Sequence, residues 1–160
     1  MKCLIKNRKG TAEVIGTMLF IIILLFFFTN VYLWHDSATK EANQLYLEKI
    51  NSTFQIQQIN GVLVVTANGG STIDLSRLWI IDNTLNEHYY ANLGNVQVAA
   101  GESFNITFSS DENYYNPASP IPVTIEGSIA QVNYYASTSY NVTCTVVNSL
   151  GVAESTIFTP

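Results

Sequence analysis

The chain has 160 residues, enough for one long helix and one compact domain of about 100 residues. Hydrophobic residues make up 48% of the sequence and charged residues only 12%, a low charged fraction for a soluble protein. Four of the seven Lys and Arg residues lie in the first nine positions, and the remainder after Gly10 has three cations and twelve acids, a formal charge of −9. This acidic balance argues against nucleic acid as a partner.

An apolar segment of 21 residues, without a charge or a proline, runs from Val14 to Trp34. At about 1.5 Å per residue, a helix of this length measures roughly 31 Å, which is enough to cross the hydrocarbon core of a bilayer. Phe26, Phe27 and Phe28 are consecutive and therefore point in three directions around the helix. A helix that is apolar on all sides has no solvent face, so we expect it in lipid or inside a bundle of helices.

The pattern changes after His35 without a Pro or Gly to interrupt the helix. Apolar residues now recur at three- and four-residue spacing, which predicts an amphipathic helix. We predict one helix from about Thr11 to Asn51, roughly 60 Å long. Two helices with a hinge near Thr29-Asn30 or His35-Asp36 are the alternative. The second half of the helix has one face free to pack on a domain, formed by Ala38, Ala42, Leu45, Tyr46 and Ile50.

The residues before the apolar segment are typical of a leader peptide. The basic residues of positions 1–10 keep this end in the cytoplasm and the acidic remainder outside, by the positive-inside rule. A secretory signal peptide has a shorter apolar segment, about 7–15 residues, followed by a small-residue cleavage site, and neither feature is present. The cut is therefore predicted before the apolar segment, between Gly10 and Thr11. An uncleaved cytoplasmic anchor of a single-pass membrane protein is the alternative.

The motif RKGTAEVIGTML resembles the start of archaeal type IV pilins, which carry a class III signal peptide. The resemblance implies that a prepilin peptidase cleaves at Lys9-Gly10-Thr11. It also implies that an assembly ATPase and a platform protein then extract the subunits from the membrane and polymerise them through their helices. Bacterial pilins place an acid five residues after the cut, whereas Glu13 is the third residue here, which argues against a bacterial major pilin.

Glu13 has two interpretations. An acid in the first helical turn is favoured by the helix dipole. Alternatively, Glu13 of one subunit pairs with the new amine of Thr11 on a neighbour, because an unpaired carboxylate in an apolar filament core costs several kcal/mol. We assign Glu13 and the three phenylalanines, Phe26, Phe27 and Phe28, to assembly.

From Phe54 onward the sequence predicts seven or eight short strands at roughly ten-residue spacing. Asn60-Gly61 predicts a type I′ hairpin turn between FQIQQI and VLVVTA. The predicted fold class is α+β: a long N-terminal hydrophobic helix followed by an all-β, immunoglobulin-like sandwich. The predicted segments are the leader (1–10), the transmembrane and filament-core helix (11–53) and the extracellular domain (54–160). AGESFNITF and the last strand pair resemble the outer domains of archaeal pilins and archaellins.

Three N-x-S/T sequons begin at Asn51, Asn105 and Asn141. In SFNITF and SYNVTC, strand alternation places Asn105 and Asn141 on the face opposite the apolar residues, where a glycan can sit. Glycosylation of these sequons is predicted, with ordinary surface residues as the alternative. The same alternation buries Cys144 as a core residue. Cys3 lies in the leader, so no disulfide is predicted in the processed chain.

No enzyme signature and no cofactor or metal site is predicted. His35 and His88 stand apart from other metal-ligating residues, and Asp111-Glu112-Asn113 is interpreted as a solvated loop rather than a calcium site. In each tyrosine doublet, one ring is expected to face the core and the other to face outward, where it is available for contacts. The doublets are Tyr89-Tyr90, Tyr114-Tyr115 and Tyr134-Tyr135.

These features predict a structural subunit of an extracellular, archaeal type IV pilus-like filament that serves adhesion or surface attachment at the cell surface. Its partners are further copies of itself, the membrane as a precursor, and the processing and assembly machinery. An archaellin, the subunit of the motility filament, is the second hypothesis, although archaellins commonly have glycine at the position of Glu13. A single-pass membrane-anchored binding module is the third.

Overall fold

The structure is a computed structural model that describes residues 3–109, 116–134 and 141–159, with side chains from Gly10 onward. The chain divides into two compact units, Met1–Tyr46 and Leu47–Pro160, which are described separately. The first unit is helical, and the second contains the end of the helix and all the strands of the described ranges.

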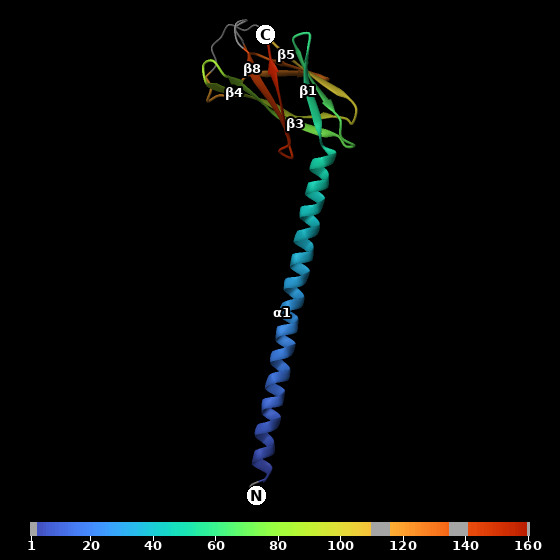
Figure 1. The fold of residues 1–160 in the computed structure, drawn as a ribbon, viewed down its shortest axis with the longest axis vertical. Coiled ribbons are helices and arrows are strands. Elements are labelled where there is room, and N and C mark those ends of the chain that lie inside the picture. Colours follow the sequence, from blue (N-terminus) through green and yellow to red (C-terminus); the bar gives the residue numbers. More distant parts are fainter. Residues whose placement is uncertain (1–2, 110–115, 135–140, 160) are drawn as a thin grey trace. The chain divides into compact units, whose positions relative to one another are not determined.

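One uninterrupted helix, α1, extends over Cys3–Asn51 (Figure 1). The predicted single helix is confirmed, and neither of the two proposed hinges is present. The helix begins before Thr11, because the residues that precede it include no proline and Gly10 alone costs a helix only about 1 kcal/mol. Its end at Asn51 agrees with the prediction.

The apolar side chains of α1 are exposed on all sides of the helix. Among the large hydrophobic residues of Val14–Trp34, exposure ranges from 38% at Leu24 to 74% at Trp34. By length and composition, this is the helix among the described residues that can cross a membrane. The amphipathic second half is exposed as well, at Leu45 and Tyr46 in the first unit. The first unit therefore supplies no cover for its own apolar surface.

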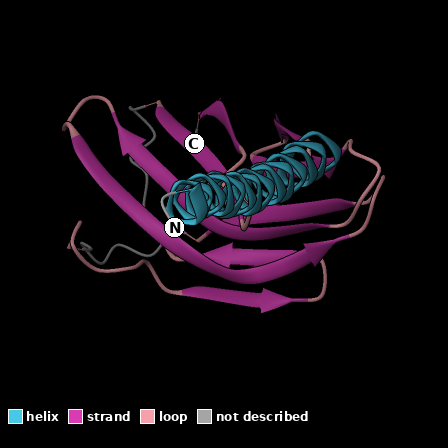
Figure 2. Ribbon diagram, turned by 90° about the horizontal axis from the view of Figure 1, so that it is seen from below, coloured by secondary structure: helices cyan, strands magenta, loops and turns pink. Residues whose placement is uncertain are grey.

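The second unit is a β-sandwich of two sheets, whose strands are drawn in magenta in Figure 2. One sheet has the strand order β1-β2-β5-β7-β6 and the other has the order β4-β3-β8-β9. All neighbouring strands are antiparallel except β5 and β7, which are parallel. The strands are β1 (Phe54–Ile59), β2 (Val62–Ala67), β3 (Ile73–Asp82), β4 (Glu87–Val98), β5 (Ser103–Phe108), β6 (Val123–Glu126), β7 (Ile129–Val132), β8 (Val142–Asn148) and β9 (Ala153–Phe158).

The predicted sandwich is confirmed, whereas the immunoglobulin-like topology stays a prediction. The orders β1-β2-β5 and β4-β3-β8-β9 correspond to strands A-B-E and C′-C-F-G of an immunoglobulin domain. However, the place of strand D beside β5 is taken by β7, which comes later in the chain and runs parallel to β5. The hairpin β6–β7 is therefore an insertion between β5 and β8.

Residues with positive φ form one hairpin turn and one bend within a strand. Asn60 and Gly61 have φ angles of 50° and 77°, so both adopt the positive φ that a type I′ turn requires, and the predicted hairpin is confirmed. β4 is one long strand. Gly94 and Asn95 lie within it at φ angles of 65° and 58°, which lets the strand bend without ending.

The core lies between the two sheets and is closed at one edge by a side-chain amide. Leu63, Phe104 and Ile106 from one sheet face Leu78 and Ile80 from the other, and all five are buried. At the edge, the side-chain amide of Gln58 in β1 forms the pair of hydrogen bonds that a neighbouring strand would otherwise form with Thr159. Its Nε2 donates to the carbonyl oxygen of Thr159 at 2.6 Å, and its Oε1 accepts from the Thr159 backbone N–H at 3.0 Å.

The last turn of α1 is part of the second unit, and its carbonyl groups are bonded by residues that follow the helix. The last four carbonyls of a helix have no partner within it, so something else must satisfy them. Ser52 is buried; its N–H donates to the carbonyl of Glu48 at 3.0 Å, and its hydroxyl donates to that of Lys49 at 3.1 Å. The hydroxyl of Ser71 donates to the carbonyl of Asn51 at 2.9 Å. Asn148, at the end of β8, donates from Nδ2 to the carbonyl and hydroxyl oxygens of Ser52, both at 3.3 Å.

The turn between β2 and β3 approaches the helix end so closely that only glycine fits. The backbone N–H groups of Asn68 and Gly69 both donate to the carbonyl of Thr53, at 3.1 and 2.9 Å. A Cβ atom on Gly69 would lie 1.8 Å from the carbonyl oxygen of Asn51. On the adjacent Gly70, a Cβ atom would meet no other atom within 4 Å.

We predict that Gly69→Ala lowers the free energy of unfolding of the second unit by about 3 kcal/mol or more, because backbone on both sides must move. Gly70→Ala is the matched control and is expected to stay within about 1 kcal/mol of the unsubstituted protein. The measurement is urea unfolding of the full chain in detergent micelles, followed by the fluorescence of Trp79. Equal stabilities of the two variants would show that the helix end is not held in this way.

Candidate functional site

The apolar segment of α1 is the first candidate site, and its polar side chains are bonded to its own backbone. Thr17 Oγ1 donates to the carbonyls of Glu13 and Val14, at 3.1 and 2.9 Å. Thr29 Oγ1 donates to the carbonyl of Leu25 at 2.8 Å, and Asn30 Nδ2 donates to that of Phe26 at 2.8 Å. Because a polar group without a partner is costly in lipid, these local bonds make the segment suitable for an apolar environment on every side.

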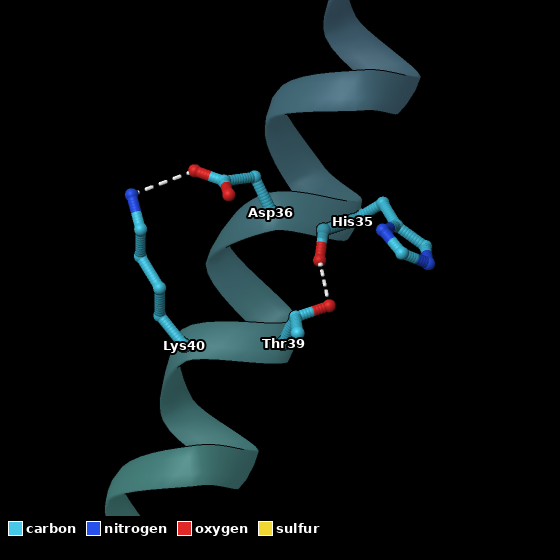
Figure 3. A network of polar contacts seen from close by, with 4 residues as sticks. All are labelled: His35, Asp36, Thr39 and Lys40. Carbon is cyan, nitrogen blue, oxygen red and sulfur yellow. Dashed lines mark hydrogen bonds and ion pairs between the residues drawn. The ribbon is translucent and has the colours of Figure 1, made fainter.

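A polar boundary follows the apolar segment directly. Lys40 Nζ lies 2.7 Å from Asp36 Oδ2, one helical turn away, and Thr39 Oγ1 donates to the carbonyl of His35 at 2.8 Å (Figure 3). The His35 ring points away from both contacts, and the described residues include no group of three or more His, Cys, Asp or Glu side chains that could hold a metal. An exposed ion pair contributes little to stability. The Asp36–Lys40 pair matters here because it shows where the apolar segment of α1 ends and its polar surface begins.

The residues predicted for processing and assembly all lie on α1. Gly10, Thr11 and Glu13 are exposed, as are Phe26, Phe27 and Phe28, at 72%, 64% and 59%. Glu13 and Phe26 are about 20 Å apart along the helix axis, so they cannot form one site within a single chain. Any joint role requires a second copy of the helix.

The three predicted glycosylation residues differ in accessibility. Asn51 and Asn141 are exposed, whereas Asn105 in β5 is half-buried. The predicted alternation is confirmed within the strands: Ile106 is buried opposite Asn105 in β5, and Val142 and Cys144 are buried in β8, which begins directly after Asn141. Glycosylation itself stays a prediction, and the exposure is more favourable at Asn51 and Asn141 than at Asn105.

The first tyrosine doublet divides between core and surface as predicted. Tyr89 is buried, donates a hydrogen bond to Glu87, and packs against the ring of Tyr134 at a centroid distance of 5.3 Å. Tyr90 points to the outer face of β4 and is half-buried. The remaining doublet residues, Tyr114, Tyr115 and Tyr135, lie outside the described residues, as do Asp111, Glu112 and Asn113.

A cluster on the outer face of the second sheet was not anticipated from the sequence. Arg77 and Trp79 of β3 lie directly opposite Asn92 and Tyr90 of β4, and the four side chains line a hollow of about 330 Å³. The rings of Trp79 and Tyr90 are 5.4 Å apart at an angle of 40°. The sequence of β3 contained a signal for this cluster, because its apolar residues change from odd to even positions. Ile73 and Leu75 are buried before the change, and Leu78 and Ile80 are buried after it.

No protein-family model matches the chain, and a search of curated proteins finds no match.

Cys144 is confirmed as a buried free thiol of the core. Burial raises the pKa of the Cys144 thiol from 9.0 to about 12, because the thiolate would lose its hydration. Burial also raises the pKa of Tyr134 from 10.0 to about 12, with smaller contributions from the negative charges of Asp82, Cys144 and Glu87. A thiol that stays protonated is a poor nucleophile, so Cys144 serves packing.

We predict that the folded domain loses stability above pH 9. Below that pH the thiol is protonated in both states, so its contribution is fully present. Between pH 9 and 12 the unfolded chain ionises and the folded chain does not, which lowers the free energy of unfolding by about 1.4 kcal/mol per pH unit. In Cys144→Ala, the free energy of unfolding should change little with pH between pH 9 and pH 10. Above pH 10 the raised pKa of Tyr134 also lowers the free energy of unfolding, so this range does not isolate the thiol.

Val146→Ala is the control, because it removes a buried side chain from the same face of β8 without removing a titrating group. It should lower stability by a similar amount at every pH and keep the slope. Urea unfolding at a series of pH values measures both variants. An unchanged slope in Cys144→Ala would contradict the assignment.

Proposed function

We propose that this chain is the structural subunit of an extracellular, archaeal type IV pilus-like filament. The observation that carries the proposal is one continuous helix with exposed apolar side chains all around Val14–Trp34, directly after Lys9-Gly10-Thr11 and Glu13. A helix of this kind needs cover from lipid or from other helices, and a pilin-like subunit uses both in turn.

The two environments make similar demands on the helix. In a membrane there is no hydrophobic driving force between helices, so association depends on close packing. In the filament, copies of α1 replace the lipid around one another, and an apolar circumference suits both states. Thr17 and Thr29 also suit both, because each hydroxyl group donates to a carbonyl of its own helix, and Asn30 places one N–H of its amide in the same way.

The proposal includes processing, location and role. A prepilin peptidase removes residues 1–10, the assembly machinery extracts the subunit from the plasma membrane, and the acidic β domain lies at the cell surface. The filament serves adhesion or surface attachment. N-glycans at Asn51, Asn105 and Asn141 and the excess of acids would help to keep the outer domain soluble.

Two alternatives lead to different observations. An archaellin would polymerise in the same way, and its loss would abolish swimming rather than attachment. A single-pass anchored binding module would keep its leader and remain monomeric, and the hollow lined by Arg77, Trp79, Tyr90 and Asn92 is the observation in its favour.

We predict that Gly10→Val blocks processing and filament formation. A Cβ atom on Gly10 meets no other atom within 4 Å, so the variant keeps the helix and changes only what the peptidase reads. Gly16→Ala is the control, because a Cβ atom is equally free there. N-terminal sequencing should show a start at Thr11 for the unsubstituted and Gly16→Ala proteins and a start at Met1 for Gly10→Val. Electron microscopy of sheared surface material should then show filaments only where Thr11 is the first residue.

A start at Met1 in the surface protein of unsubstituted cells would contradict the filament proposal and support the anchored module.

We further predict that Glu13→Gln lowers the filament yield by a factor of about ten or more while processing is unchanged. Removing one partner of an ion pair in an apolar core typically costs about 3–5 kcal/mol. Glu41→Gln, beyond the apolar segment of the same helix, is the matched control and should assemble normally. Quantitative blotting of sheared filaments against total processed subunit measures the yield. Equal yields from the two variants would contradict the pairing of Glu13 with the amine of Thr11. In the structure α1 begins at Cys3, so Glu13 does not lie in the first helical turn, where a favourable interaction with the helix dipole was expected.

A further inference from the structure

The β domain carries a feature that the proposed polymerisation through α1 does not use: the array formed by Arg77, Trp79, Tyr90 and Asn92. The cross-strand pairs Arg77–Asn92 and Trp79–Tyr90 are adjacent on the outer face of β3 and β4. Such a two-by-two array covers about 5 by 7 Å, because cross-strand neighbours are about 5 Å apart and successive outward residues about 7 Å. Two side chains are aromatic, one is a cation and one is an amide.

A β-bulge in the central strand produces this array. Between Leu75 and Arg77 the register of β3 shifts against both neighbours. Relative to β8, Ser76 is an extra residue of β3, whereas on the other side three residues of β4, Leu93, Gly94 and Asn95, lie opposite Ser76. Before the bulge the odd-numbered residues are buried, and after it the even-numbered ones are. Without the shift, Arg77 and Trp79 would point into the core. Bulges are often found where a strand must redirect a functional side chain.

The charge of Arg77 is unusual for its surroundings. It is the only Lys or Arg residue of positions 50–160, which contain eight Asp and Glu residues. Arg77 is exposed, and within the described part of the chain it forms no ion pair. A cation without an acidic partner, beside two partly exposed rings, is complementary to an anionic ligand that also has an apolar face.

We propose that this array binds an acidic sugar, a hexuronic acid residue of a polysaccharide. The C–H face of a pyranose ring is apolar and slightly positive, and it packs against the negative faces of the Trp79 and Tyr90 rings. The guanidinium of Arg77 pairs with the carboxylate of the sugar through two parallel N–H donors. Asn92 uses its Oδ1 to accept from the N–H of Gly94 at 2.9 Å, which leaves its Nδ2 directed to a sugar hydroxyl.

Further hydroxyl groups continue the array across the sheet. Thr145 of β8 lies opposite Trp79, and Ser155 of β9 lies opposite Thr145, with the two hydroxyl oxygens 2.8 Å apart. The row Tyr90–Trp79–Thr145–Ser155 therefore provides a second position for a neighbouring sugar unit. Pockets of this composition, aromatic with a few convergent polar groups, are typical of ligand sites.

The position of the array favours a saccharide over a peptide. β3 is an inner strand, paired with β4 on one side and β8 on the other. On the outer edge of β4, the Tyr90 carbonyl accepts from the Ile121 N–H at 2.8 Å, so the backbone at the array is not available to a peptide strand. Recognition must therefore use side chains. The tilted rings of Trp79 and Tyr90 provide a surface that fits a sugar ring better than it fits an extended peptide. A simple anion would need Arg77 but neither ring.

This inference deepens the adhesive role in the proposed function, yet the site lies within the β domain and does not depend on polymerisation. It is therefore tested on the full chain in detergent micelles, without filament assembly. Failure to bind sugar leaves the filament proposal intact, and failure to polymerise leaves the sugar site intact.

Isothermal titration calorimetry with a galacturonic acid oligomer, and with a galactose oligomer of the same length and linkage, tests the site. We expect the acidic oligomer to bind about tenfold or more tightly than the neutral one. Arg77→Gln should lower affinity for the acidic oligomer by about tenfold or more and leave the neutral one unchanged. Trp79→Ala should abolish detectable binding of both oligomers.

The controls remove the same chemical groups elsewhere. Lys49→Gln removes the other cation of the second unit, and Tyr46→Ala removes an exposed ring of α1; both variants should bind like the unsubstituted protein. Circular dichroism confirms folding. Should Trp79→Ala unfold, Asn92→Ala and Arg77→Lys test the same array with smaller changes, and both should weaken binding of the acidic oligomer.

Three outcomes would overturn the proposal. One is no binding of the acidic oligomer at millimolar concentration. Another is equal binding of a poly-glutamate of matched charge, which would assign the site to an acidic peptide. The third is an equal effect of Arg77→Gln and Lys49→Gln, which would reduce the interaction to net charge.

Discussion

The apolar circumference of α1 is the constraint on which the rest of the molecule depends. Full burial of a Leu or Phe side chain contributes about 1.5–3 kcal/mol, and the segment Val14–Trp34 exposes such side chains on every side. No arrangement of one copy of the first unit can recover this energy, so the chain requires lipid or other helices around it. The same constraint explains why Thr17, Thr29 and Asn30 donate hydrogen bonds to their own helix. A polar group bonded to a neighbouring molecule would restrict the helix to neighbours that provide a matching acceptor.

The last turn of α1 belongs to the second unit, where its free carbonyl groups need partners from outside the helix. Ser52 and Ser71 donate to these carbonyls, and Asn148 donates to the carbonyl and hydroxyl oxygens of Ser52. Asn148 also holds the turn between β8 and β9, because its Oδ1 accepts from the N–H groups of Leu150 and Val152 at 3.0 and 2.8 Å. One buried amide thus connects Ser52, directly after the helix, to a strand end almost 100 residues away in sequence.

Much of this fold could be predicted from the sequence because its signals are local. The apolar segment, the Asn60-Gly61 turn and the alternation around Cys144 each act within a few residues. The parallel pairing of β5 with β7 could not be predicted, since it depends on contacts between distant segments. The close approach of Gly69 to Asn51 was equally hidden, because a glycine in a turn does not reveal what lies beside it. The N-terminal motif predicted the residues used in assembly. The predicted pairing of Glu13 with the amine of Thr11 joins two copies, so the structure of one chain does not test it.

The array on β3 and β4 shows why strict alternation can mislead where function is concerned. Applied from Ile73 and Leu75, alternation would bury Arg77, and an unpaired guanidinium in an apolar core is too costly to be tolerated. The conflict is resolved by the bulge at Ser76, which weakens the ladder of an inner strand. A regular strand would need an apolar residue in place of Arg77 and polar residues in place of Leu78 and Ile80, so the residues after Leu75 fit only the bulged strand. The bulge thereby places the only cation of positions 50–160 on the same outer face as the two partly exposed rings, which is the arrangement that the proposed saccharide site requires.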